Sequence, residues 1–314
     1  MKKNKTTILI IGIAGGLAQV TARKIMSADP DTEIVGIDNR SIDFKHPNVI
    51  TEKLRYTKGQ FENLFRRYQF DYVIHLARLT HSKDSDFDLE KRLNFNIMST
   101  HIILDLCKEF QIKKLIFLST YHVYGALADN SVFLSEDDPL RASLKYSELR
   151  DVVEMDQMMS SYVSIHGNPF EVIIFRPTNI VGPLIKNSMT QFLTHPLSFY
   201  SVEYNPMFQF ISDLDVADII ALSLYKVPSG VYNLAPNDFI SFKEALEIVK
   251  NNHAKPFSIL MAGLMNKMVH LVPDYLLDYL KFSSLIDNKK IVSLLGKNIF
   301  SHSSAKSLEL LKIY

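Results

Sequence analysis

Short runs of β-branched and aliphatic residues alternate along the chain with longer segments in which apolar residues recur at helical spacing. Runs of the first kind predict strands at residues 7–11, 33–37, 72–75, 114–118 and 171–175. Segments of the second kind predict helices at residues 17–28, 59–68, 89–110 and 146–166. Strands that alternate with helices of this length favour right-handed crossovers and a parallel sheet with helices on both faces. The pattern therefore predicts a doubly wound α/β fold.

The alternation becomes irregular after residue 178, where prolines and short apolar runs replace it. We predict one sheet-bearing domain from residues 1–178 together with about 206–236. A smaller mixed lobe is expected from residues 179–205 and 237–314. Large apolar side chains are frequent in this lobe and predict either an ordinary core or a lipophilic pocket: Phe257, Leu260, Met261, Leu264, Met265, Met268, Leu271, Tyr275, Leu276, Leu277 and Leu280.

The charge balance argues against nucleic acid or an anionic membrane as a partner, since 35 Lys and Arg face 34 Asp and Glu. The apolar run at residues 8–18 follows three lysines and imitates a secretory signal, but glycines interrupt it and a second strand follows, so we expect none. Residues 259–280 are apolar but contain Lys267 and Pro273, which predicts helices rather than a membrane span. The single cysteine, Cys107, predicts a buried thiol in a cytoplasmic protein.

Small residues recur where the first predicted strand turns into a helix, in the segment GIAGGLA at residues 12–18. Gly12 permits a tight turn, Gly15 lets the backbone approach a pyrophosphate, and the helix N-terminus offers amides to its phosphates. Asp38, at the end of the second strand, can accept both ribose hydroxyls and would repel a 2′-phosphate. These features predict a site for NAD, with NADP disfavoured, although the Arg40 guanidinium could receive a 2′-phosphate.

Four later segments complete a family pattern: FDYVIHLA at residues 70–77, NIMST at 96–100, STYHVYG at 119–125 and RPTNIVGP at 176–183. With the glycine segment, they resemble the extended short-chain dehydrogenase/reductase family, the group of NAD-dependent epimerases and dehydratases. The resemblance covers nearly the whole chain and implies a Rossmann-like dinucleotide domain with a substrate lobe at the C-terminus. It also implies a set of residues that contact the cofactor: Gly12, Gly15, Gly16, Leu17, Asp38, Asn39, Leu54, Leu76, Ala77, Asn96, Tyr146, Arg150 and Pro177.

The same resemblance implies hydride transfer assisted by a tyrosine phenolate and by a hydroxyl that polarises the same substrate oxygen. By position, Tyr146 would be that tyrosine and Thr120 that hydroxyl. A phenol has a pKa of about 10, so a base at neutral pH needs a nearby cation. The family has Lys four residues later on the same helix face, whereas this chain has Arg150. A guanidinium can hold a phenolate and reach ribose hydroxyls, but it does not exchange its proton as an ammonium does.

Departures from the family pattern bear on the substrate. Tyr121 and His122 stand where the family's dehydratases have Asp-Glu, which argues against a sugar-nucleotide dehydratase and makes His122 a candidate acid or base. Phe208 replaces an Arg that clamps the substrate diphosphate in epimerases. The segment EKLR at residues 52–55 stands where an acidic residue near adenine is expected. Thr120, His122, Asn179 and Phe208 form the predicted substrate-binding set.

The sequence therefore predicts an NAD-dependent epimerase or dehydrogenase that acts on a hydroxyl-bearing substrate such as a sugar or nucleotide sugar. Two alternatives stay open: a reductase of a less polar ketone or alcohol, and a catalytically weak NAD-binding sensor or assembly protein. Scattered histidines show no metal-ligand spacing, so no metal is expected. Apolar residues on more than one face of the predicted helices at 89–110 and 146–166 favour a homodimer.

Overall fold

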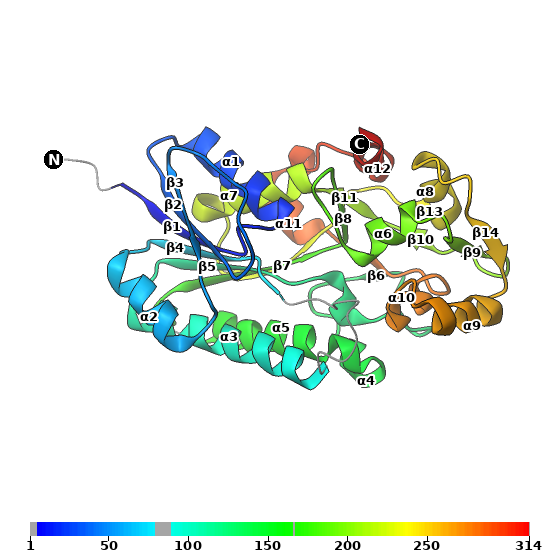
Figure 1. The fold of residues 1–314 in the computed structure, drawn as a ribbon, viewed down its shortest axis with the longest axis horizontal. Helices are drawn as coiled ribbons and strands as arrows, with labels where there is room; N and C mark the ends of the chain where they lie inside the picture. The colour runs from blue at the N-terminus through cyan, green and yellow to red at the C-terminus, as the bar shows by residue number, and fades with distance from the viewer. Residues whose placement is uncertain (1–4, 79–88, 166, 314) are drawn as a thin grey trace. The chain divides into compact units, whose positions relative to one another are not determined.

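The computed structural model describes residues 5–78, 89–165 and 167–313 (Figure 1). They pack into two compact units, each built from three stretches of chain. The first unit comprises Met1–Ser119, Glu148–Phe175 and Ala217–Val231, and the second comprises Thr120–Ser147, Arg176–Val216 and Tyr232–Tyr314. This division differs from the predicted domains mainly in placing Thr120–Ser147 in the second unit. The predicted roles of the domains in binding cofactor and substrate stay predictions.

A seven-stranded sheet organises the fold, in the order β12-β7-β5-β4-β1-β2-β3. The pairs β3-β2, β2-β1, β1-β4, β4-β5 and β5-β7 are all parallel, which confirms the predicted doubly wound α/β fold. The strands are β1 (Thr7–Ile11), β2 (Glu33–Asp38), β3 (Val49–Lys53), β4 (Tyr72–His75), β5 (Lys114–Leu118), β7 (Glu171–Pro177) and β12 (Gly230–Leu234). All five predicted strands are therefore present, while the two edge strands, β3 and β12, were not predicted.

The order of the strands reverses beside β1, because β2 lies on one side of it and β4 on the other. After β1 the chain therefore continues to β2 on one side of the sheet, and after β4 it continues to β5 on the other side. In open parallel sheets, such a switch point opens a crevice in which ligands bind. Both segments belong to the first unit.

Helices cover both faces of this sheet (Figure 1). On one face lie α2 (Lys58–Arg67), α3 (Leu89–Glu109) and α5 (Arg150–Ser164), and on the other lie α1 (Gly16–Ala28) and α7 (Asp213–Lys226). Buried Lys114 of β5 fixes the end of α7, since its Nζ donates to the carbonyls of Ser223 (2.9 Å), Leu224 (3.3 Å) and Val227 (2.9 Å). The predicted buried thiol is confirmed, because Cys107 of α3 is fully buried in this core.

The second unit consists of short helices and two-stranded sheets. The strand pairs are β10-β13, β11-β8, β14-β9 and β15-β6. The strands are β6 (Phe133–Leu134), β8 (Asn179–Val181), β9 (Phe199–Ser201), β10 (Met207–Phe208), β11 (Phe210–Ser212), β13 (Ile240–Ser241), β14 (Lys255–Phe257) and β15 (Leu285–Ile286). The helices are η1 (Tyr121–Tyr124), α4 (Ala142–Lys145), α6 (Ser188–Thr194), α8 (Phe242–Ile248), α9 (Ile259–Val269), α10 (Asp274–Tyr279), α11 (Lys289–Leu295), η3 (Lys297–Ile299), α12 (Ser304–Glu309) and η4 (Leu310–Ile313).

One predicted helix starts later than expected. The helix predicted at residues 146–166 is α5, which begins at Arg150, and it is preceded by the 3₁₀ turn η2 (Ser147–Leu149). Tyr146 itself is extended, with φ −120° and ψ 101°. Tyr146 and Arg150 therefore do not share a face of one continuous α-helix, and the predicted one-turn relation between them is wrong.

The apolar residues of α9 are not an ordinary core. Leu260 and Met268 are 77% and 81% exposed, and Met261 and Leu264 are also exposed, whereas Leu276 of the neighbouring α10 is buried. The stretch does form two helices, as predicted. Among the described residues, no helix combines the length and apolarity that crossing a membrane requires.

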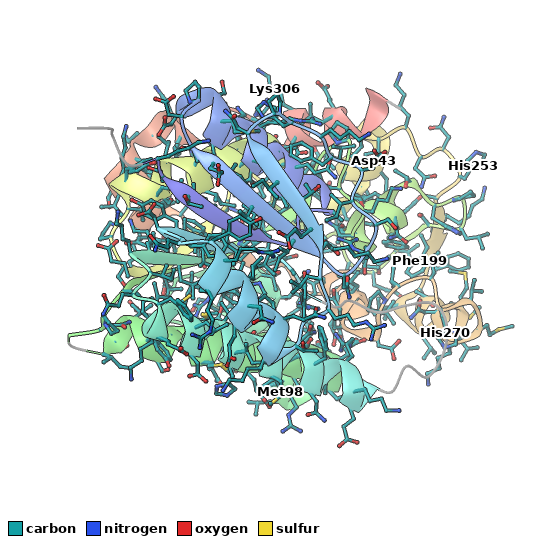
Figure 2. The ribbon with its side chains drawn as sticks, turned by 60° about the vertical axis from the view of Figure 1, so that its left-hand side comes forward. Asp43, Met98, Phe199, His253, His270 and Lys306 are labelled. Carbon is teal, nitrogen blue, oxygen red and sulfur yellow. The ribbon has the colours of Figure 1, made fainter. Side chains whose placement is uncertain are left out.

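The apolar residues that favoured a dimer are mostly buried within the chain. Val152, Val153, Met155 and Met159 of α5 are at most 2% exposed and contribute to the packing of the first unit. Figure 2 labels Met98, which is 58% exposed on the outer face of α3. The homodimer stays a prediction, now with Met98 as the exposed apolar residue on these two helices.

Candidate active site

The turn that leaves β1 requires glycine at position 12. Gly12 has φ +98°, which L residues rarely adopt. A Cβ placed on Gly12 would lie 3.0 Å from the Cα and the backbone N of Ala77, at the end of β4. The chain segments that leave β1 and β4 are therefore in close backbone contact at the switch point.

The N-terminus of α1 follows immediately and is open to an anion. Gly15 is the N-cap and contributes no side-chain hydrogen bond, and the first turn carries no acidic residue. A Cβ on Gly15 would lie 3.2 Å from the carbonyl oxygen of Gly12, so glycine keeps this turn tight. Amides without partners and the positive end of the helix dipole favour a phosphate at this position.

Asp38 lies at the end of β2 and is already hydrogen-bonded. Its carboxylate accepts from the backbone N of Ala14 (3.1 Å) and Arg40 (2.9 Å), and from Nε and Nη2 of Arg40 (both 3.0 Å). Burial alone would raise the pKa of Asp38, but the hydrogen bonds and the charge of Arg40 outweigh it and hold the pKa below its ordinary value. Asp38 is therefore an anion, and its two oxygen atoms already accept hydrogen bonds from Arg40 and from the backbone of Ala14.

The other predicted cofactor residues of the first unit lie around the same strand ends. The backbone N of Leu54 donates to the carbonyl of Asp38 (2.8 Å), and the backbone N of Leu76 donates to that of Ile11 (3.0 Å). Asn39 is exposed beside Asp38. Thus the structure brings Gly12, Gly15, Gly16, Leu17, Asp38, Asn39, Leu54, Leu76 and Ala77 to the carboxyl ends of β1, β2, β3 and β4. Pro177 belongs to the second unit.

Asn96 takes part in a buried polar cluster between α3 and α5. Its Nδ2 donates to Asp151 Oδ2 (2.6 Å), and Nη1 of Arg92 lies 3.2 Å from the same oxygen. Asn96 also accepts through its carbonyl from Thr100 Oγ1 (2.9 Å). Arg92 and Asp151 were not predicted as buried residues, since charged residues inside a helical pattern give no signal of burial. Asn96 braces the packing of the first unit in this structure.

Tyr146 is held inside the second unit. It is 8% exposed, and its hydroxyl donates to the carboxylate of Asp278 on α10. Lys145 Nζ lies 2.5 Å from Oδ2 of the same carboxylate and 5.3 Å from the centre of the Tyr146 ring. Neither Lys145 nor Asp278 was identified from the sequence.

Thr120 and His122 belong to the same unit and lie around an aromatic cluster. Thr120 Oγ1 accepts from the backbone N of His122 (3.3 Å). The His122 ring packs against Tyr121, Tyr275 and Tyr279, with ring centres 4.3, 5.0 and 4.8 Å away. Tyr275 also lies 6.4 Å from the Tyr146 ring, so one side chain joins the η1 segment to Tyr146.

Arg150 points along its own helix. Its Nε donates to Glu154 Oε1 (2.6 Å), and its side chain is 63% exposed. This hydrogen bond raises the pKa of Arg150 above its ordinary value, so the guanidinium stays charged. Arg150 belongs to the first unit and Tyr146 to the second, and the predicted action of Arg150 on Tyr146 stays a prediction.

The remaining substrate candidates are buried in the second unit. Asn179 Nδ2 donates to the Tyr121 hydroxyl (2.9 Å) and to the carbonyl of Gln209 (3.3 Å). Phe208 is 3% exposed and packs with Phe210 and Phe242, at 5.9 and 5.4 Å between ring centres. Within the described residues, no three His, Cys, Asp or Glu side chains form a group that could hold a metal. Substrate contacts by Asn179 and Phe208 stay predictions.

The chain is similar to curated sugar-nucleotide enzymes. It is 30% identical over 195 residues to a dTDP-D-glucose 4,6-dehydratase of Dictyostelium discoideum, which covers 56% of this chain and 44% of that protein. It is 26% identical over 256 residues to a UDP-glucose 4-epimerase of the same organism, which covers 72% of this chain and 71% of that protein. The chain thus spans less than half the length of the first of these relatives.

Solved structures share the fold. The dTDP-glucose 4,6-dehydratase of Bacillus anthracis, in complex with NAD, superposes with a TM-score of 0.76 at 16% identity, covering 97% of this chain and 94% of that one. At this identity the similarity concerns the fold alone. A sequence profile of the NAD dependent epimerase/dehydratase family matches residues 8–235, which is most of the chain. By this match, the chain belongs to the NAD dependent epimerase/dehydratase family.

Proposed function

We propose that this chain is an NAD-dependent epimerase or dehydrogenase acting on a hydroxyl-bearing substrate, with nucleotide sugars as the leading substrate class. The observation that carries the proposal is the cradle at the switch point, where Gly12 at φ +98° meets Ala77 beside the open N-terminus of α1. Family membership supports the reaction class, and the names of the dehydratase and epimerase relatives support the substrate class.

The residues present fit a dinucleotide. A side chain on Gly12 would collide with the backbone of Ala77 and one on Gly15 would crowd the Gly12 carbonyl oxygen, so the glycines keep the turn before α1 tight. The first amides of α1 can hold a pyrophosphate. Asp38 can accept the ribose hydroxyls once Arg40 releases it. NAD, when bound, supplies the acceptor and donor of hydride.

Tyr146 and Thr120 are proposed to act on one substrate oxygen. The Tyr146 hydroxyl exchanges a proton with the substrate oxygen, and Thr120 Oγ1 hydrogen-bonds to the same atom. Tyr146 lies in a mostly buried position among aromatic rings, where water competes weakly for its hydroxyl. The chain's own contribution is thus to hold a proton at Tyr146 Oη and to orient the substrate oxygen toward it.

We favour an epimerase or dehydrogenase over a dehydratase because of residues 121 and 122. Tyr121 is buried, and its hydroxyl accepts from Asn179. His122 is packed among tyrosine rings. No carboxylic acid stands at these two positions to expel a hydroxyl group from the substrate.

The test is turnover with a panel of UDP- and dTDP-sugars, free sugars and hydrophobic alcohols, followed by NADH absorbance and by NMR of the sugar. Native protein is expected to turn over a nucleotide sugar, and Tyr146→Phe and Thr120→Val are expected to lose most of that activity. Tyr225→Phe, at a 59% exposed tyrosine of the first unit, is the matched control. Activity that survives Tyr146→Phe unchanged would remove Tyr146 from the mechanism. NAD binding without any turnover would favour the sensor alternative.

A further inference from the structure

The hydroxyl of Tyr146 lies beside a Lys–Asp pair from two other parts of the second unit. Lys145 ends α4, and Asp278 lies on α10, 132 residues after Tyr146. Asp278 accepts from the Tyr146 hydroxyl, and Lys145 Nζ lies 2.5 Å from the same Oδ2. One carboxylate oxygen therefore binds both the phenol and the ammonium.

Packing fixes this arrangement. Leu276 and Tyr279 of α10 are at most 2% exposed, so the helix that carries Asp278 is anchored on both sides of it. The Asp278 and Lys145 side chains are 24% and 45% exposed, which leaves the pair only partly screened by solvent. A partly buried pair acts on a neighbouring group more strongly than an exposed pair does.

Aromatic side chains of the second unit also lie near Tyr146. The Tyr275 ring lies 6.4 Å from the Tyr146 ring, and the His122 ring of η1 lies 5.0 Å from the Tyr275 ring. Tyr279, whose pKa burial raises well above its ordinary value, stays a neutral phenol. Lys145 and Asp278 therefore bring two opposite charges directly to Tyr146.

We propose that Lys145 and Asp278 are positioning residues that control where the proton of Tyr146 resides and when its hydroxyl is available to a substrate. The proposal rests on the proposed function, since it concerns the same tyrosine. Asp278 keeps the phenol protonated and directed away from the substrate, and Lys145 offsets the negative charge that this requires. A phenol donates one hydrogen bond, so a substrate oxygen must displace Asp278 before Tyr146 can serve it.

Neutralising Asp278 and neutralising Lys145 should shift the pH at which the Tyr146 phenolate forms in opposite directions. Asp278→Asn removes a negative charge beside the phenol, so the phenolate of Tyr146 should form at lower pH. Lys145→Met leaves Asp278 uncompensated, so the phenolate should form at higher pH. In each direction we expect the midpoint to move by about 1 pH unit, the low end of the shifts that a close charge produces.

The measurement is tyrosinate absorbance against pH on the full chain, with and without NAD. Subtracting the Tyr146→Phe titration in each background isolates the signal of Tyr146. Where turnover is measurable, the acid limb of the pH profile of kcat/KM should move to lower pH in Asp278→Asn and to higher pH in Lys145→Met. Asp278→Glu, which keeps the carboxylate, should restore the native midpoint at least in part.

The chain offers a matched control in the same unit. Lys289 and Asp287 form a pair of the same kind, 2.6 Å apart, and Lys289→Met and Asp287→Asn change net charge identically. Both control variants should leave the Tyr146 midpoint unchanged. Shifts in the same direction for both Tyr146-pair variants, or no shift in either, would overturn the proposal. Because absorbance needs no substrate, a chain without turnover would refute the proposed function and still decide this inference. Lys145 is half exposed, so Lys145→Met keeps the test open if Asp278→Asn fails to fold.

Discussion

Replacing Asp38 with alanine removes a carboxylate that accepts hydrogen bonds from the backbone N of Ala14 and from three nitrogen atoms of Arg40. If NAD binds at the switch point, the same carboxylate receives the ribose hydroxyls, and a hydrogen bond to a charged group contributes about 1.5–3 kcal/mol. Binding must first separate Asp38 from Arg40. The Arg40 side chain is 63% exposed and the Asp38 side chain is 3% exposed, so solvent screens the pair from one side, and we take about 1 kcal/mol, the upper end of the range for solvent-exposed pairs, as the cost of separating it. The expected net loss in Asp38→Ala is about 1–2 kcal/mol, or roughly 5–30-fold in Kd.

Calorimetry with NAD and NADP decides this prediction. Asp38→Ala should weaken the binding of NAD. It should also reduce the preference for NAD over NADP, because removing the carboxylate removes its repulsion of the 2′-phosphate of NADP. Asp218→Ala is the matched control, since Asp218 pairs with Lys24 (2.8 Å) between α7 and α1 of the same unit. Equal affinity of the native protein for NAD and NADP, or an unchanged Kd in Asp38→Ala, would refute the reasoning from Asp38.

Four further changes test other parts of the structure. Gly12→Ala should destabilise the fold by about 1–3 kcal/mol in thermal melts, because φ +98° is strained for alanine, whereas Gly59→Ala in open space should not. Arg150→Ala should lower turnover and NAD affinity, while Arg150→Lys should keep both. Equal kinetics in the native protein and both variants would contradict a role of Arg150 in catalysis. Met98→Glu should convert a dimer to a monomer by light scattering, and a monomeric native protein would contradict the predicted dimer. Asp38 has a lowered pKa, so its contribution to stability is present above about pH 4 and is lost as pH falls further; acid unfolding should be shallower in Asp38→Asn.

The strands of the sheet interior could be predicted because each is a continuous apolar run. Both β1 and β4 match their predicted ranges, since burial on both faces demands apolar residues at every position. The edge strand β3 has the sequence VITEK and pairs with β2 alone, so its residues are only partly buried. Such a strand needs no apolar run, and periodicity could not reveal it.

The contacts of Tyr146 could not be predicted from the sequence, for a different reason. Residues 146–149 fit a helical pattern, yet a contact with Asp278 accompanies an extended Tyr146, and the helix begins only at Arg150. No spacing rule connects residues 132 positions apart. The family resemblance directed attention to position 150, while the cation next to the Tyr146 ring comes from Lys145, on the other side in sequence.

The exposure of α9 divides the methionines into two chemical classes. Met268 and Met261 are 81% and 52% exposed, so peroxide can convert them to sulfoxides in the folded protein without breaking any packing. Met155 and Met159 are at most 1% exposed, and their oxidation requires the first unit to open. Mapping the sulfoxides by mass spectrometry would therefore report two separate events on one chain. Protection of Met261 and Met268 would report that a partner covers α9, and oxidation of Met155 and Met159 would report that the core beneath α5 has opened.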